Sequence, residues 1–186
     1  MKNKGRTDKL EILKKFERMI SEDKSIYLDL DEIEEIIIHY FHEANYEMAE
    51  NAIALANQIF PNSINVSILN SEILLQKSKE TEAFELINEC LDLNSENFDL
   101  IFQKAKILNK LKKYEDSNNL LFQISEIEET IFLVDDLMLR NFMNMDQYSK
   151  SIKVAKRLIS QFPDDKKYMD KLISCFRLSK MENNAI

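Results

Sequence analysis

The chain has 186 residues, 45% of them hydrophobic, and a formal net charge of -8. This apolar content excludes a disordered chain, and the scarcity of Gly (one) and Pro (two) disfavours sheet-rich folds and phosphate-binding loops, whose turns depend on Gly. The scarcity of these turn residues therefore predicts an all-helical protein. Because an acidic protein repels phosphate backbones, we also expect no nucleic-acid partner.

The first 29 residues combine positive charge with an apolar stripe. Seven Lys or Arg residues fall in the first twenty positions. The apolar residues at helical spacing are Leu10, Leu13, Phe16, Met19 and Ile20. This pattern predicts a basic capping helix and leader over residues 1–29 that covers one end of the structure that follows.

Neither a secretory leader nor a membrane span is expected. No apolar core or cleavage site follows the basic start of the chain, and nowhere do 18 apolar residues run together. Cys90 and Cys175 lie far apart, form no CxxC pair and fit a reducing compartment. We therefore expect a cytoplasmic protein with no membrane partner.

From Leu30 onward the sequence repeats with a period of 34 residues. The small residues Ala49, Ala83, Ser117 and Ser151 recur in one frame, as do Tyr46, Tyr114 and Tyr148. Small side chains at a fixed position let two helices cross closely, so the period predicts stacked helical hairpins. The predicted repeats cover residues 30–63, 64–97, 98–131 and 132–165, and an incomplete fifth repeat forms a C-terminal capping helix at 166–186.

Polar residues at the repeat boundaries predict where the first helix of each hairpin, helix A, begins. Asp29, Ser63, Asn97 and Asp165 stand directly before successive A helices and can accept hydrogen bonds from their free N–H groups. The boundary near Thr130 has no such residue. We expect the third repeat to depart from ideal geometry there.

With Tyr40, Tyr46, Ala49 and Pro61 at its eleventh, seventeenth, twentieth and thirty-second positions, the first repeat resembles the tetratricopeptide repeat (TPR) family. The resemblance implies an all-α solenoid, a right-handed superhelix of stacked antiparallel helical hairpins. Asp135 departs from it, because the family has a large apolar residue at that fourth position. The leader before residue 30 looks like that of long bacterial TPR proteins with no assigned chemistry, so the chain is similar to their N-terminal part.

Chemical constellations are weak in this sequence. His39 and His42 lie three residues apart, but they have neither the HExxH order nor a third ligand. Cys90 falls in a buried small-residue column of the frame, and Cys175 has no His near it in sequence. We expect no catalytic residue, no cofactor and no metal site, and hence no enzyme.

The resemblance also implies a concave groove lined by five positions of each A helix. In this chain the groove would present Glu34, Ile38, Phe41, His42, Ile68, Glu72, Leu75, Phe102, Lys106, Asn109, Leu133, Arg140 and Met143. Apolar residues on a solvated groove are typical of a partner site. The alternative, that tighter packing turns some of these residues into core, stays open.

The expected partner is a protein or peptide segment with basic and apolar character. Acidic Glu34 and Asp99 occupy positions at which the family's carboxylate clamp has Lys, so an acidic tail is disfavoured. The sequence thus predicts a non-enzymatic scaffold or adaptor that mediates protein–protein interaction. Two alternatives remain: a structural protein that dimerises through Leu172, Phe176 and Leu178 of its exposed C-terminal helix, or the N-terminal fragment of a longer repeat protein.

Overall fold

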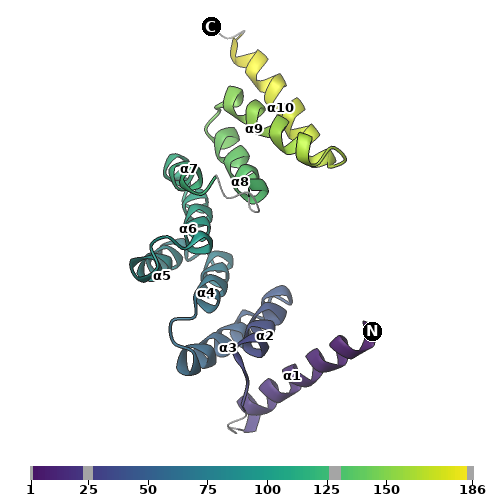
Figure 1. The fold of residues 1–186 in the computed structure, drawn as a ribbon, viewed down its shortest axis with the longest axis vertical. Helices are drawn as coiled ribbons and strands as arrows, with labels where there is room; N and C mark the ends of the chain where they lie inside the picture. Colours follow the sequence, from purple (N-terminus) through teal and green to yellow (C-terminus); the bar gives the residue numbers. More distant parts are fainter. Residues whose placement is uncertain (1, 23–26, 126–130, 184–186) are drawn as a thin grey trace. The chain divides into compact units, whose positions relative to one another are not determined.

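The computed structural model describes residues 2–22, 27–125 and 131–183, which form α-helices and no strand (Figure 1). The helices are α1 (Lys2–Glu22), α2 (Leu30–His42), α3 (Tyr46–Ile59), α4 (Ile64–Gln76), α5 (Glu80–Leu93), α6 (Phe98–Lys110), α7 (Tyr114–Gln123), α8 (Ile131–Asn144), α9 (Tyr148–Gln161) and α10 (Lys166–Asn183). The predicted all-helical fold is confirmed.

The helices follow the 34-residue register of the sequence. Helices α3, α5, α7 and α9 begin at Tyr46, Glu80, Tyr114 and Tyr148, each 34 residues after the one before. Helix α7 has 10 residues, whereas α3, α5 and α9 have 14 each. The third hairpin therefore departs from the others as expected, although Thr130 itself lies outside the described residues.

The predicted helix caps are confirmed. Asp29 Oδ1 accepts a hydrogen bond from Glu32 N at 2.9 Å, and Glu32 Oε2 accepts one from Asp29 N at 3.0 Å, which completes a capping box. At the start of α4, α6 and α10 the caps are Ser63, Asn97 and Asp165. Each side chain satisfies a backbone N–H group that the helix itself leaves unpaired.

The turn inside each hairpin contains one residue with positive φ. These residues are Ala44, Ser78, Lys112 and Asp146, with φ between 55° and 60°. They also recur every 34 residues, so the turn geometry repeats together with the helices. The left-handed conformation costs a non-glycine residue about 1 kcal/mol. In each turn the N–H of the next residue donates to a carbonyl of the preceding helix, as Asn45 N does to the carbonyl of Tyr40 at 2.9 Å.

The chain divides into two compact units, residues 1–90 and 91–186. In unit 1, α1 packs on α2, and α2 packs on α3 and α4. Phe16 and Leu13 of α1 are buried in this core, whereas Leu10 and Ile20 remain about half exposed at 54% and 46%. Only the middle of the predicted N-terminal stripe is therefore buried.

A hydrogen bond fixes α1 to α2. Tyr40 Oη donates to Glu17 Oε1 at 3.1 Å, and the Tyr40 ring lies 6.1 Å from the Phe16 ring. Burial and the Glu17 carboxylate raise the pKa of Tyr40 to about 12, because both disfavour the phenolate. Helix α1 is thus held on α2 by this aromatic pair and hydrogen bond, together with ion pairs of Lys9 with Glu35 and of Lys15 with Glu32.

Unit 2 contains helices α6 to α10, with α8 packed between α7 and α9 and α9 packed on α10. Its apolar core includes Leu137, Leu139, Ala155 and Leu158, all at most 1% exposed. Asp135 of α8 is buried as well, at 1% exposure, and it forms an ion pair with Arg157 of α9. The departure of Asp135 from the repeat pattern is therefore compensated by a cation from the next helix.

A polar network is also buried in unit 2. Asn141 Nδ2 of α8 donates to Ser117 Oγ at 2.9 Å and to Asn118 Oδ1 at 2.8 Å, both on α7. Asn141 Oδ1 accepts from Asn109 Nδ2 of α6 at 2.5 Å, and Ser117 Oγ donates to the carbonyl of Ala105 at 2.8 Å. One buried amide therefore links three helices.

Candidate partner-binding surfaces

The predicted groove residues are divided between the two units. Those on α2 and α4 belong to unit 1, and those on α6 and α8 belong to unit 2. We name the first set the α2/α4 face: Glu34, Ile38, Phe41, His42, Ile68 and Glu72. We name the second set the α6/α8 face: Phe102, Lys106, Asn109, Leu133, Arg140 and Met143.

A hydrogen bond from α4 fixes one carboxylate of the α2/α4 face. Asn65 Nδ2 of α4 donates to Glu34 Oε2 of α2 at 3.3 Å. Ile38 is 39% exposed, while Phe41 and Ile68 are partly buried. The face therefore combines an accessible aliphatic side chain with a carboxylate fixed by the neighbouring helix.

One oxygen of that carboxylate has no hydrogen-bond partner. Glu34 Oε1 is buried and unpaired among the residues that the structure describes, although the other oxygen is held by Asn65. A buried acceptor without a donor is costly, and that cost is removed if the side chain rotates to meet a donor that a partner supplies. Glu34 is accordingly the residue of this face whose geometry most clearly favours a bound donor.

Leu75 does not contribute to this surface. The sequence placed it on the groove, but its side chain is 7% exposed and belongs to the core. The alternative of tighter packing thus applies at this position. Its apolar surface is unavailable to a partner in this structure.

The two histidines are held by different aromatic rings. The His42 ring lies 5.8 Å from Phe41 in an edge-to-face arrangement, and the His39 ring lies 5.1 Å from Tyr40. Within the described part of the chain, no group of three or more His, Cys, Asp or Glu side chains is placed to hold a metal ion. His42 is exposed at the end of α2, where it lies next to Phe41 of the α2/α4 face and is accessible to a partner.

The α6/α8 face has an aromatic pair and an exposed leucine. Phe102 stacks on Phe98 with ring centroids 6.1 Å apart and an interplanar angle of 7°. Leu133 is 44% exposed, and Met143 is partly buried. This face therefore offers apolar contact area on two helices that contact each other.

Polar residues of the α6/α8 face are engaged within the unit. Asn109 donates to the buried Asn141, and Arg140 Nη2 lies 3.1 Å from Asp136 Oδ2. Lys106 is partly buried. These side chains are already ordered by the fold, so a partner would meet them with little loss of their conformational freedom.

The structure shows an ion cluster around Asp136 that sequence reasoning missed. Lys167 Nζ lies 3.0 Å and Lys171 Nζ 3.3 Å from Asp136 Oδ1, in addition to the contact with Arg140. Burial opposes ionisation of Asp136, but the three cations outweigh it and keep its pKa below the ordinary value. The i, i+4 spacings of Asp136 with Arg140 and of Lys167 with Lys171 were the available signals.

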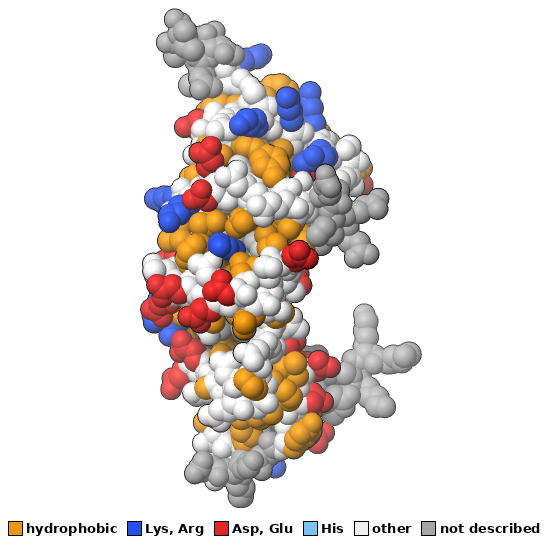
Figure 2. All heavy atoms as spheres, turned by 60° about the vertical axis from the view of Figure 1, so that its left-hand side comes forward, with side chains coloured by type: hydrophobic (Ala, Val, Ile, Leu, Met, Phe, Trp, Pro, Cys, Tyr) orange, Lys and Arg blue, Asp and Glu red, His pale blue; other side chains and the backbone are white. Residues whose placement is uncertain are grey.

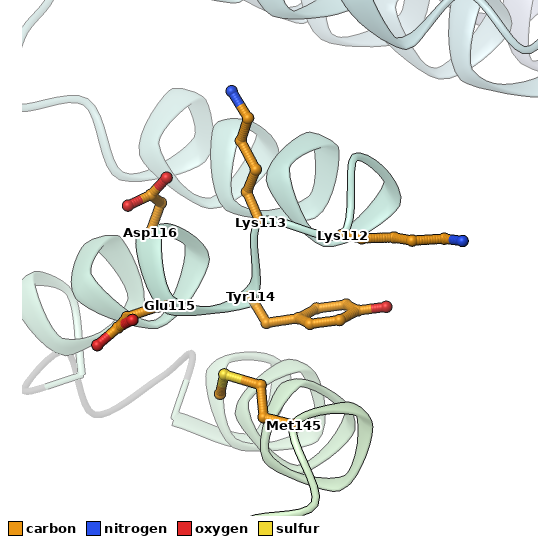
Figure 3. A pocket seen from close by; sticks show the side chains of 6 residues that line it. All are labelled: Lys112, Lys113, Tyr114, Glu115, Asp116 and Met145. Atoms are coloured by element: carbon orange, nitrogen blue, oxygen red, sulfur yellow. The ribbon is translucent and has the colours of Figure 1, made fainter.

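Two shallow depressions lie on α7 and the turns beside it. The larger, of about 350 Å³, is lined by Lys112, Lys113, Tyr114, Glu115, Asp116 and Met145 (Figure 3). Figure 3 shows Lys112 and Tyr114 extending side by side, while Lys113 and the two carboxylates point elsewhere. The second, of about 120 Å³, lies next to Phe142 and Lys150. The polar groups of the larger depression do not converge on one point, as bound substrate would require.

The two thiols differ in environment. Cys175 is buried, and this burial raises the pKa of its thiol, opposed by a hydrogen bond from Ser151. A thiol with a raised pKa is a poor nucleophile. Cys90 is partly exposed, so its predicted placement in a buried column is wrong.

Among the described helices, none has the length and apolar character needed to cross a bilayer.

Comparisons with known proteins were consistent with this architecture. The family model for subunit 3 of the anaphase-promoting complex, or cyclosome, matches residues 45–124. No curated protein matches the chain.

Solved structures of repeat proteins match the chain over most of its length. A thermophilic TPR protein of Thermus thermophilus matches with a TM-score of 0.70 and 14% identity, over 88% of either chain. A tetratricopeptide repeat protein of Parabacteroides merdae ATCC 43184 has a TM-score of 0.75 and 13% identity, over 97% of this chain and 71% of that one. MamA AMB-1 has a TM-score of 0.67 and 14% identity, over 83% and 91%. At these identities the matches show the fold.

Proposed function

We propose that this chain, whose TPR fold and family match support its assignment to the TPR proteins, is a non-enzymatic scaffold that binds a protein segment through its A helices. TPR-type proteins are generally interaction scaffolds. The observation that carries the proposal is the α2/α4 face, where an exposed Ile38 stands one helical turn from the unpaired oxygen of Glu34. The four repeats and two capping segments expected from the sequence are part of the proposal.

The chemistry of the α2/α4 face favours a ligand that is both basic and apolar. A Lys or Arg of the ligand would pair with the Glu34 carboxylate once that side chain rotates to bring Oε1 to the surface, and an adjacent apolar side chain would cover Ile38. Glu35 already attracts a cation, since Lys9 Nζ lies 3.9 Å from its carboxylate. The proposed partner is therefore a protein segment with alternating cationic and apolar residues, in a reducing cytoplasmic setting.

Crosslinking in the source cell followed by mass spectrometry would identify the partner segment, whose synthetic form is then titrated against purified protein. Ile38→Asp should weaken binding by about tenfold, because it places a charge in the apolar contact. Phe122→Asp is the matched control, since Phe122 is 57% exposed on α7 outside both faces. Equal affinity of the Ile38→Asp variant and the wild type, with unchanged circular dichroism, would reject the α2/α4 face as the binding surface.

Self-association is the second candidate function. It is favoured by exposed apolar side chains on α10, including Phe176 at 42% and Leu178 at 39%. Light scattering over a dilution series tests it, because a dimer that forms through this helix dissociates on dilution. A constant monomer mass at every concentration would exclude this function.

A further inference from the structure

The hairpin of α9 and α10 has the opposite charge to the rest of the chain. Residues 148–183 contain nine Lys or Arg and four Asp or Glu, a net charge of +5, in a chain whose total is -8. The remaining residues therefore carry -13. Arg157, Lys167 and Lys171 pair with Asp135 and Asp136 of α8, so a ligand would be attracted mainly by the other cations of this hairpin.

An apolar stripe runs along the accessible side of α10. Met169, Ile173 and Phe176 are 43%, 42% and 42% exposed, at spacings of four and three residues that place them on one side of the helix. The neighbouring side of α10 is buried, with Tyr168 at 1% and Cys175 at 0% exposure. The stripe thus has the width and spacing that a second helix would contact.

Cations lie beside this stripe and beyond both of its ends, with one exposed acid, Asp170, next to it. Lys156 of α9 lies 5.9 Å from the centre of the Phe176 ring. On α10 itself, the exposed Lys166 and Arg177 are two turns before and one turn after Ile173, and Lys180 is one turn after Phe176. Figure 2 shows Lys and Arg side chains beside hydrophobic ones near the C-terminal end, at the top of the view. We define the stripe and these four cations as the α10 face.

We propose that the α10 face binds an acidic amphipathic helix of a partner protein, whose apolar residues cover the stripe and whose Asp and Glu residues pair with the surrounding cations. This surface and its ligand differ from those of the α2/α4 face, which favours a basic segment. The proposal does not depend on the scaffold function proposed above, and it competes with self-association, which would use Phe176 of the same helix. A helix is the expected form of the ligand because the i, i+4, i+7 stripe matches the apolar period of another helix.

Other occupants fit the same observations less well. A second copy would bring two sets of the same cations together, which is unfavourable. An anionic bilayer requires apolar side chains that protrude, whereas these are about 40% exposed and lie along the helix. A nucleic acid would contact the cations but leave the apolar stripe uncovered.

The test uses the whole chain and a fluorescent peptide of roughly 20 residues, with Leu at helical i, i+3, i+4 spacing and Glu on the other positions. A scrambled peptide of the same composition and a peptide with Lys in place of Glu are the ligand controls. Anisotropy titrations should show binding of the amphipathic acidic peptide only, and weaker binding as salt increases.

Charge reversal on the protein identifies the surface. Lys156→Glu combined with Arg177→Glu should weaken binding by about tenfold or more, since two attractive contacts become repulsive. Lys110→Glu combined with Lys112→Glu makes the same charge change at exposed positions of α6 and the following turn, and should leave binding unchanged. All four positions are exposed, and circular dichroism verifies that each variant is folded.

Several results would overturn the proposal. Equal binding of the scrambled peptide, or equal loss of binding in the control pair, would show that only net charge matters. Capture by phosphatidylserine vesicles or duplex DNA without binding of the acidic peptide would assign the face to another class of ligand. A dimer lost on Ile173→Asp, without peptide binding, would assign it to self-association. Because Ile38→Asp does not alter the α10 face, the two proposals can fail independently.

Discussion

The ion pair between Asp135 and Arg157 gives a quantitative test of how unit 2 is stabilised. Asp135 is 1% exposed, whereas the Arg157 side chain is 53% exposed. Arg157 Nε donates to Asp135 Oδ2 at 2.5 Å, and Nη2 donates to Oδ1. Mutation of the two residues should therefore change the free energy of unfolding by very different amounts. The buried carboxylate needs the guanidinium to compensate its charge, whereas the guanidinium can be solvated by water.

Arg157→Met retains an apolar stem but leaves the buried carboxylate without a cation. Breaking a buried pair in this way costs about 3 to 5 kcal/mol, and partial access of water near Arg157 sets our expectation at the lower value. Asp135→Leu removes the buried charge and restores an apolar residue at the fourth repeat position, while Arg157 turns to solvent. We expect this change, and the double variant, to stay within about 1 kcal/mol of the wild type.

Urea unfolding followed by circular dichroism measures the free energy of unfolding of the four proteins. The double-mutant cycle should give a coupling of about 3 kcal/mol between the two side chains. Additive effects, or an Arg157→Met variant within about 1 kcal/mol of the wild type, would show that the bond does not compensate a buried charge.

Two further predictions concern buried polar groups. Because burial and Glu17 raise the pKa of Tyr40 from 10.0 to about 12, its contribution to stability is complete below pH 10 and is lost as the pH rises towards 12. Tyr40→Phe should reduce this alkaline loss in urea unfolding at several pH values, and an unchanged pH dependence would contradict the assignment. Asn141→Leu leaves Asn109 and Asn118 without their partner, so it should lower the free energy of unfolding by about 3 kcal/mol, measured by thermal denaturation. The control Asn119→Leu, at an exposed position, should change the free energy of unfolding by about 0.5 kcal/mol at most. Similar melting of the two Asn variants would indicate that the network adds little.

Helix positions and their caps could be predicted because they depend on neighbouring residues. Asp29 caps α2 through an amide three residues away, and the 34-residue frame reproduces the starts of α3, α5, α7 and α9. The positive φ at Lys112 and its equivalents was not predicted, because none of these turn residues is a glycine. A local helix-end motif accompanies that conformation, since the N–H of the next residue bonds to a carbonyl of the preceding helix, as Lys113 N does to the carbonyl of Leu108 at 2.9 Å.

The candidate site could be predicted only in part. The frame identified Ile38 and Leu133 as exposed apolar residues, but it gave the same status to Leu75, which is buried. The basic α10 face was not predicted, because the chain's total charge is negative and masks the excess of cations in its last two helices. The distribution of charge along the sequence shows that residues 148–183 are basic. Only the structure shows which of these cations lie next to an apolar stripe.

Sequence alone determined the repeat period, the helix caps and the all-helical fold, since all of these follow from side-chain size and hydrogen bonding within a few residues. Tertiary structure decided that Arg157 compensates Asp135 from 22 positions away and that Asn141 links three helices. Such pairings depend on how helices pack, because the energy of a buried polar group is set by the partner that packing brings within hydrogen-bond distance.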